Sequence, residues 1–192
     1  MPYDAMSAVS DDALLVMFAN GDGEAARMLT LRLAPRVLRL ATRMLGDAAD
    51  AEDVTQEAML RLWRIAADWR PGEAQVGTWL YRVASNLCTD RLRRKRPVDI
   101  ASVPEMPDGR AAPEDDLLDA DRARALQEAL AQLPERQRQA VILRHLEGLS
   151  NPEIAEVMDI GVEAVESLTA RGKRALVAAL SGRREELGYG HG

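Results

Sequence analysis

Apolar residues recur at helical spacing along most of the chain. Between residues 11 and 19 they lie on one helical face, and after a break marked by Gly21 and Gly23 a longer amphipathic segment runs on towards Leu45. We expect Pro35 to kink or restart the longer helix and Gly46 to end it. Stretches that alternate with a period of two are few, and clusters of Val, Ile and Thr are scarce. Because such stretches are typical of strands, their scarcity predicts an all-α protein.

The next amphipathic segment, DAEDVTQEAMLRLWRIAADW, covers residues 50–69. Its apolar stripe predicts a helix packed on a core. A polar face on another side carries Asp53, Gln56 and Glu57. This face is either solvated or a docking surface for a basic partner. The spacing of these residues alone favours a solvated face.

A loop rich in Pro and Gly, residues 70–77, precedes a helix that begins near Thr78. Counting in steps of three and four puts an aromatic ring, an amide and guanidinium groups on one side of this helix, at Trp79, Arg82, Asn86 and Arg93. Rings stack on bases, an amide reads a base edge and Arg neutralises phosphate, so this side suits single-stranded nucleic acid. A core position for Trp79 is about equally expected. The basic run RLRRKR, residues 91–96, could alternatively be a solvated helix end.

The C-terminal part of the chain predicts a helix-turn-helix. In LSNPEIAEVMDIGVEAVESLTARGKRAL, Ser150 and Glu153 have the spacing of a capping box. The DIG sequence suits the turn, and Val165 and Leu168 would seat the second helix on the first. A purely structural hairpin would give a similar pattern, but the cationic end of the second helix favours DNA. Gly172 should soften that helix by about 1 kcal/mol.

The charge distribution divides the chain. Its 192 residues carry a net charge of -6, yet residues 99–121 hold eight acids and one Arg, a sum of -7, which leaves +1 for the remainder. Several prolines in this stretch make it a linker. The expected organisation is two small helical domains, residues 1–97 and 119–192, joined by residues 98–118, with helix resuming near Pro113 or Glu114. We hypothesise that the acidic linker covers a basic surface when no polyanion is bound.

Several functional classes are disfavoured by the residue types present. Cys88 is the one cysteine, and His145 and His191 are isolated, so neither an internal disulfide nor a metal site is expected. No nucleophile–base pair or phosphate loop stands out, so we expect neither an enzyme nor a cofactor. The N-terminus does not resemble a signal peptide, and no apolar stretch approaches the roughly 20 residues that span a bilayer. We therefore expect a cytoplasmic protein without membrane insertion.

Three segments in order, DAEDVTQEAMLRLW, GTWLYRVASNLCTDRLRRKR and ALAQLPERQRQAVILRHLEGLSNPEIAEVMDIGVEAVESLTARGKRAL, resemble the extracytoplasmic-function (group IV) sigma factors of bacterial RNA polymerase. The resemblance implies that the first domain binds the coiled coil of the largest polymerase subunit and the promoter -10 element. It implies that the second domain binds the -35 element and the flap of the other large subunit. The basic run would then lie along promoter DNA.

The resemblance also assigns residues. Polymerase contacts fall on Asp53, Gln56 and Glu57. Contacts to the -10 element, including a flipped-out base, fall on Arg70, Gln75, Trp79, Arg82, Asn86, Arg93 and Arg94. Contacts to the -35 element fall on Glu163, Glu166, Ser167, Arg171, Lys173 and Arg174. The family commonly has Lys and Arg where this chain has Glu166 and Leu168, which removes two phosphate contacts, while Glu166 could accept from a cytosine amino group.

The expected function is that of a sigma factor that directs core polymerase to the promoters of a stress- or signal-responsive regulon and is held inactive by an anti-sigma factor. One alternative is a free-standing helix-turn-helix regulator whose first domain senses a ligand. Another is a helical adaptor that binds only protein. Only a sigma factor would confer specific initiation on core polymerase.

Overall fold

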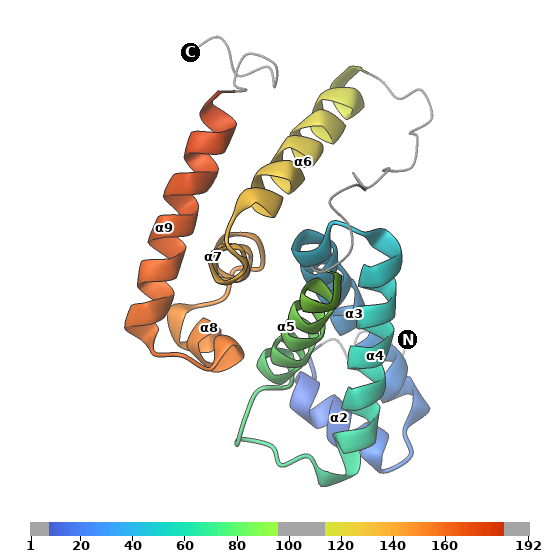
Figure 1. The fold of residues 1–192 in the computed structure, drawn as a ribbon. Helices are drawn as coiled ribbons and strands as arrows, with labels where there is room; N and C mark the ends of the chain where they lie inside the picture. Colours follow the sequence, from blue (N-terminus) through green and yellow to red (C-terminus); the bar gives the residue numbers. More distant parts are fainter. Residues whose placement is uncertain (1–7, 96–113, 183–192) are drawn as a thin grey trace.

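A computed structural model describes residues 8–95 and 114–182 of the chain, and these residues fold into helices in two units (Figure 1). The N-terminal unit, residues 8–95, contains α2 (Asp11–Ala19), α3 (Gly23–Leu45), α4 (Ala48–Ile65), the short 3-10 helix η1 (Ala66–Asp68) and α5 (Val76–Lys95). The C-terminal unit, residues 114–182, contains α6 (Glu114–Gln132), α7 (Glu135–Val141), the π-helix η2 (Ile142–Leu146), α8 (Asn151–Met158) and α9 (Val162–Ser181). Within these residues the only extended pairing is a bridge between Pro71 and Ala74. The all-α prediction is confirmed.

Residues 98–113 of the predicted linker lie outside the described residues, as do Arg96 and Pro97 at the end of the predicted first domain. The expected return to helix is confirmed, because α6 begins at Glu114. The domain boundaries at residues 97 and 118 remain predictions.

Side-chain caps set the helix starts in the N-terminal unit. The Ser10 hydroxyl accepts from the Ala13 amide at 3.2 Å, and the Asp47 carboxylate accepts from the Asp50 amide at 2.9 Å. These bonds satisfy amides that have no partner within the helix. Gly46 ends α3 with a φ of 69°, a conformation that glycine adopts without strain.

The expected restart at Pro35 is wrong, because α3 runs through this residue without a break. Pro35 is exposed. The backbone carbonyl that loses its helical partner there can therefore hydrogen-bond to water, which lowers the cost of a proline inside a helix.

The core of the N-terminal unit lies where α3 packs on α2, α4 and α5. Its largest fully buried side chains are Leu14, Leu15, Leu29, Leu33, Leu40, Met44, Leu62 and Leu80. Each such side chain contributes about 1.5–3 kcal/mol when fully buried. This packing fixes the axis of α5 and therefore the direction in which its polar side points.

The C-terminal unit contains the predicted helix-turn-helix. The Ser150 amide donates to Glu153 Oε2 at 2.7 Å, and the Glu153 amide donates to Ser150 Oγ at 3.5 Å, so the capping box forms. The hydrogen bonds from Ser150 keep the pKa of the Glu153 carboxyl below its usual range. Asp159 turns the chain with a φ of 53°, and Val165 seats α9 with its side chain fully buried.

A π-helical turn ends the helix that precedes this motif. In η2 the Glu147 amide donates to the Ile142 carbonyl at 2.9 Å, and Gly148 follows with a φ of 75°. The wider turn rotates the chain just before α8 begins. As a result, the Glu147 side chain points into the contact between the two units.

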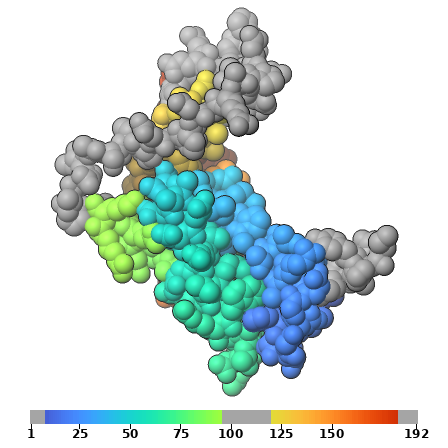
Figure 2. Space-filling view, turned by 90° about the vertical axis from the view of Figure 1, so that its right-hand side faces the viewer, coloured from blue at the N-terminus to red at the C-terminus, as the bar shows by residue number. Residues whose placement is uncertain are grey.

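The two units pack directly on each other. Buried apolar residues of both units form one continuous cluster, and α5 lies against α8 while α3 lies against α6 and η2. In Figure 2 the yellow and orange segments of the C-terminal unit rest on one end of the N-terminal unit. The positions of the helices in one unit are therefore set partly by the other.

Gly172 has a packing role that the sequence did not indicate. A Cβ at this position would lie 2.5 Å from Val141 Cγ2 and 3.1 Å from the Gln137 carbonyl oxygen. The expectation that Gly172 merely softens α9 is therefore incomplete, because the glycine lets α9 approach α7 closely.

We predict that Gly172→Ala destabilises the protein by about 1–3 kcal/mol, because the buried Val141 and the α7 backbone cannot yield without strain. Urea unfolding followed by circular dichroism measures this change. Gly77→Ala is the matched control, since a Cβ at this helical glycine meets nothing within 4 Å. That control should be neutral or stabilising by up to about 1 kcal/mol. Equal stabilisation by both variants would refute the packing role.

Candidate nucleic-acid interface

A cavity of about 270 Å³ opens where the 70–75 loop meets α5. It is lined by Ile65, Asp68, Trp69, Arg70, Glu73, Ala74 and Trp79. The two indole rings stand edge to face, with centroids 6.2 Å apart, and Trp69 is held in place because its Nε1 donates to Asp12 Oδ1 at 2.9 Å. Aromatic walls, carboxylates and one guanidinium at the rim suit a single planar heterocycle such as an unstacked base.

The position of Trp79 is compatible with both of the roles that the sequence left open. It is half-buried and packs against the hydrophobic core, and it also lines the cavity. Arg70, the other predicted residue here, is exposed at the cavity rim. Asp68 and Trp69 are cavity residues that were not predicted from the sequence, although both lie at the end of the amphipathic segment 50–69.

The polar side of α5 continues away from this cavity. Arg82, Asn86, Arg93 and Arg94 are exposed, as is Gln75 in the loop before the helix. The Arg82 guanidinium is engaged at one end, since its Nη2 lies 3.7 Å from Asp159 Oδ1 in the turn between α8 and α9. These predicted nucleic-acid residues are thus all accessible, and Arg82 already has an acidic partner.

Two cations of the basic run form ion pairs with acids at the start of α4. Arg91 Nη1 lies 2.5 Å from Asp50 Oδ1, and Lys95 pairs with the same carboxylate and with Asp47 at 3.7 Å. Since residues 91 and 95 lie one turn apart, they share the α5 face that packs on α4. The expectation that the whole run lies along DNA stays a prediction, and these two residues already have acidic partners in the chain.

Asp50 is the centre of this ion-pair cluster. Its carboxylate is largely buried, which by itself would raise its pKa. The hydrogen bonds from Lys95 and Arg91 outweigh burial, so the pKa lies below its usual range. The cluster ties the end of α5 to the start of α4.

The predicted polymerase face lies on α4. Asp53 and Gln56 are exposed, and Glu57 is partly exposed. Asp53 is also a partner of Arg91 at 3.4 Å, and Glu57 accepts from Arg61 Nε at 2.8 Å, a bond that lowers the pKa of the Glu57 carboxyl. Leu60, 43% exposed, adds apolar surface to this helix. The combination suits a protein partner more than DNA, which would be repelled by the carboxylates.

The predicted -35 residues all lie on α9. Glu163, Glu166, Arg171, Lys173 and Arg174 are exposed, and Ser167 is half-buried. Asn151 Nδ2 donates to Glu166 Oε1 at 3.5 Å, which joins the start of α8 to α9. Leu168 packs against the core, so this position contributes to packing and not to phosphate binding.

Known families match both units. The Sigma-70 region 2 family matches residues 29–98, and the Sigma-70 region 4 family matches residues 123–176. The chain is 31% identical over 168 residues to the ECF RNA polymerase sigma factor SigW of Bacillus subtilis, covering 81% of this chain and 89% of that protein. The chain belongs to the extracytoplasmic-function sigma factors. It is also 32% identical over 179 residues to the ECF RNA polymerase sigma-E factor of Escherichia coli K12, covering 88% and 93% of the two chains.

Solved structures share the fold of this sigma factor. CnrH in complex with the cytosolic domain of CnrY superposes with a TM-score of 0.69 at 24% identity, over 90% of this chain and 97% of that one. The sigma factor RpoE of Bartonella quintana, in complex with the anti-sigma factor NepR, gives a TM-score of 0.66 at 20% identity, over 81% and 96%. At these identities the likeness concerns the fold alone.

The sigma factor contains a buried polar cluster that the sequence analysis missed. The Glu147 side chain, 1% exposed, accepts from Arg43 Nη1 at 2.6 Å and from the Tyr81 hydroxyl at 3.0 Å, with Arg39 Nη2 3.6 Å away. Burial and the Glu147 carboxylate raise the pKa of Tyr81 to about 12. The partners come from α3, α5 and the end of η2, so no local motif could indicate the cluster.

Within residues 8–95 and 114–182, no group of three His, Cys, Asp or Glu side chains could hold a metal ion. Among these residues no helix is both long and apolar enough to cross a membrane. Burial raises the pKa of the Cys88 thiol to about 12, which makes it a poor nucleophile at neutral pH.

We predict that Asp50→Asn lowers the free energy of unfolding by about 1–2 kcal/mol at pH 7, because Arg91 and Lys95 lose their shared carboxylate. The folded pKa of Asp50 lies below the unfolded value of about 3.9, so its contribution is present above that value and is lost as the pH falls through the folded pKa. The difference between variant and wild type should therefore shrink towards pH 3.

Urea unfolding at both pH values measures the effect. Asp53→Asn is the control, because its carboxylate is 64% exposed and its pairing with Arg91 should contribute no more than about 0.5 kcal/mol. A destabilisation by Asp50→Asn that persists unchanged at pH 3 would contradict the ion-pair account.

Proposed function

We propose that the N-terminal unit of this sigma factor reads the promoter -10 element with the cavity and the polar side of α5. An unstacked base would enter the cavity and stack on Trp79, with Arg70 and Gln75 at the loop. Asn86 would read a neighbouring base edge, while Arg82, Arg93 and Arg94 would bind phosphates. The observation that carries this proposal is the aromatic-walled cavity at the start of an exposed cationic helix side.

The same proposal assigns the α4 face to core RNA polymerase. Asp53, Gln56 and Glu57 would contact a basic segment of the polymerase, with Leu60 buried in the contact. What supports this is the exposed mixture of carboxylates and one large apolar side chain on a helix whose other face is fixed in the core.

The recognition helix α9 would read the -35 element with unusual chemistry. Its first two turns carry the acids Glu163 and Glu166, and its cations come later, at Arg171, Lys173 and Arg174. A carboxylate near base edges accepts from the amino group of cytosine, so Glu166 favours a cytosine in the major groove. The hydrogen bond from Asn151 would hold Glu166 in position for this contact.

We also propose that an anti-sigma factor controls this protein, in the cytoplasm, and that its promoters form a stress- or signal-responsive regulon. Support comes from one similar structure, which is a complex with an anti-sigma factor. The chain would act as a promoter-specificity subunit and not as an enzyme, since the polymerase supplies the chemistry of RNA synthesis.

Run-off transcription across a library of promoters tests the proposal. Core polymerase with the wild-type chain should initiate only on promoters with one -10 and one -35 sequence. Asn86→Ala should lower discrimination at one -10 position about tenfold, which corresponds to the loss of one base contact, without changing the affinity for core polymerase. Glu57→Arg should weaken binding to core polymerase while leaving the promoter preference of the remaining complex unchanged.

Each alternative has its own outcome in the same assay. A free-standing regulator would bind DNA as a dimer without polymerase and would confer no initiation. An adaptor would bind protein but no promoter. Either result would contradict the proposed function.

A further inference from the structure

The cavity at the start of α5 has two aromatic walls that are held in different ways. Trp79 lies in the first turn of α5, where its amide donates to the Gln75 carbonyl at 3.0 Å. Trp69 lies at the end of η1, directly before a loop, residues 70–75, in which every residue is exposed. A helix therefore carries one wall, whereas the other wall stands at the edge of a solvent-exposed loop.

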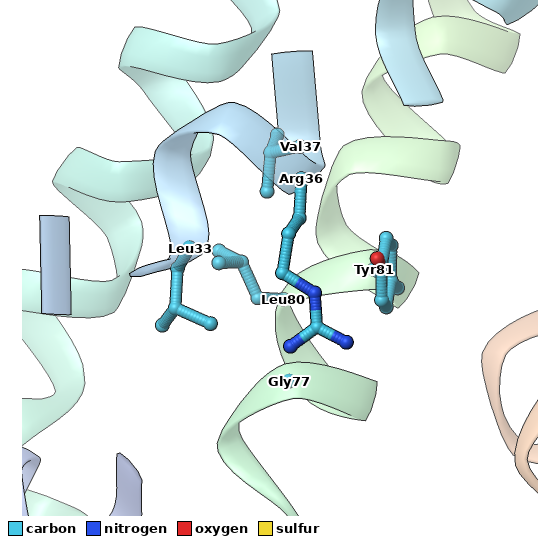
Figure 3. A pocket seen from close by; sticks show the side chains of 6 residues that line it. All are labelled: Leu33, Arg36, Val37, Gly77, Leu80 and Tyr81. Carbon is cyan, nitrogen blue, oxygen red and sulfur yellow. The ribbon is translucent and has the colours of Figure 1, made fainter. Parts of the chain in front are cut away.

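Core packing sets the direction of the Trp79 side chain. The next two residues of α5, Leu80 and Tyr81, are only 1% and 4% exposed. Figure 3 shows the crevice between α3 and α5, in which Leu80 points toward Leu33 and Val37 of α3. A helix that is packed in this way cannot turn about its axis without opening voids in the core. The Trp79 wall is therefore fixed by the fold itself.

The Trp69 wall depends on a hydrogen bond to another helix. Trp69 Nε1 donates to Asp12 Oδ1 at 2.9 Å, and this partly buried bond joins residues 57 positions apart in the chain. An indole N–H can only donate, and a carboxylate is a stronger acceptor than a neutral oxygen. The ion pair between Arg70 and Glu73, at 3.6 Å, joins two residues of the loop itself and does not anchor the ring.

Helix α2 holds Asp12 in a fixed place. Leu14 and Leu15 of this helix are fully buried in the core of the N-terminal unit. The start of α2 is tied to α3, because Arg32 Nη1 donates to Asp11 Oδ1 at 3.0 Å. The acceptor of the Trp69 hydrogen bond therefore has a defined position before any DNA is bound.

The two indole rings together form a corner. Their centroids are 6.2 Å apart, and their planes meet at 81°. A planar base that stacks on the face of one ring meets the other ring along its edge. Rotation of the Trp69 side chain would change this corner, so the shape of the cavity depends on the bond to Asp12.

We propose that Asp12 is a positioning residue for promoter reading, which holds Trp69 in the orientation that receives a single unstacked base. A ring that is ordered before binding does not lose its freedom on binding, and this raises the affinity for the base. The proposal rests on the proposed function, in which the cavity takes a base of the -10 element. It adds a residue of α2, which lies outside the segment 29–98 that matches the Sigma-70 region 2 family.

The hydrogen bond itself is tested by NMR on the chain alone. The three tryptophans give three indole N–H signals, and Trp69→Phe identifies the one that belongs to Trp69. Asp12→Ala should speed the exchange of this proton with water about tenfold, as expected for the loss of one charge-assisted hydrogen bond. Asp12→Asn should keep the exchange slow, because its amide oxygen still accepts. Asp11→Ala is the matched control, since it removes the neighbouring carboxylate, whose partner is Arg32.

Base binding is measured with holoenzyme assembled from core polymerase and the full chain. The probes are single-stranded -10 oligonucleotides with a sequence taken from the run-off library, in which each base is replaced in turn by an abasic site. The wild type should lose about tenfold in affinity at one abasic position, where a stacked base is missing. For Asp12→Ala the loss at that position should be only about two- to threefold, because the intact base is bound more weakly. The salt dependence of binding should stay the same, since no phosphate contact is removed.

A second variant examines the same bond from the donor side. Trp69→Phe keeps an aromatic ring but removes the N–H group, so it should reduce the abasic effect about as much as Asp12→Ala does. In the Trp69→Phe background, Asp12→Ala should have no further effect, because the bond is already absent. If Asp12→Ala lowers the helix content of the protein, Trp69→Phe takes its place in the binding measurement.

Four results would overturn the proposal: an unchanged exchange rate of the Trp69 proton in Asp12→Ala, an unchanged abasic effect, equal weakening of the intact and abasic probes, or the same effect from Asp11→Ala. Equal weakening would show that Asp12 supports stability only. A wild-type holoenzyme without any base-dependent position would contradict the proposed base cavity as well. Failure of the positioning role alone is distinct, since the wild type would then discriminate bases and Asp12→Ala would do so equally well.

Discussion

The buried carboxylate of Glu147 is the interaction on which the arrangement of the two units depends. A charge that is removed from water is tolerated only with close partners, and here Arg43, Arg39 and Tyr81 provide them. Because these partners belong to α3 and α5, the carboxylate fixes the C-terminal unit against the two helices that also form the core of the N-terminal unit. The π-helical turn of η2 contributes to this contact, because it places Glu147 there.

Helix α5 links the proposed recognition surfaces to that contact. Its first turn carries Trp79 at the cavity, its middle carries Tyr81 and Arg82 at the interface, and its last turn is tied to α4 through Asp50. The proposed polymerase face on α4 and the proposed -10 surface on α5 are therefore held in one rigid relation.

Local signals carried most of the sequence prediction. The capping box at Ser150, the turn before α9 and the glycine that ends α3 each depend on neighbouring residues, and all three were found from the sequence. Helical spacing would also have placed Arg91 and Lys95 on a different face of α5 from Arg93, because only the first two lie on the face that packs on α4. Glu147 gave no such signal, because Arg43 lies 104 residues away along the chain. Gly172 gave no local signal either. A glycine is required there because α7 packs closely on α9, and the hydrophobic periodicity of α9 does not indicate how close that contact is.

A double-mutant cycle between Arg43 and Glu147 tests the central claim most directly. The free energies of unfolding of the wild type, Arg43→Ala, Glu147→Ala and the double variant give the coupling energy of the pair. A buried charge pair across a real interface predicts a coupling of about 1.5–3 kcal/mol, with the two units unfolding together. A coupling near zero, with the units unfolding in separate transitions, would show that Glu147 does not join them and would contradict the account.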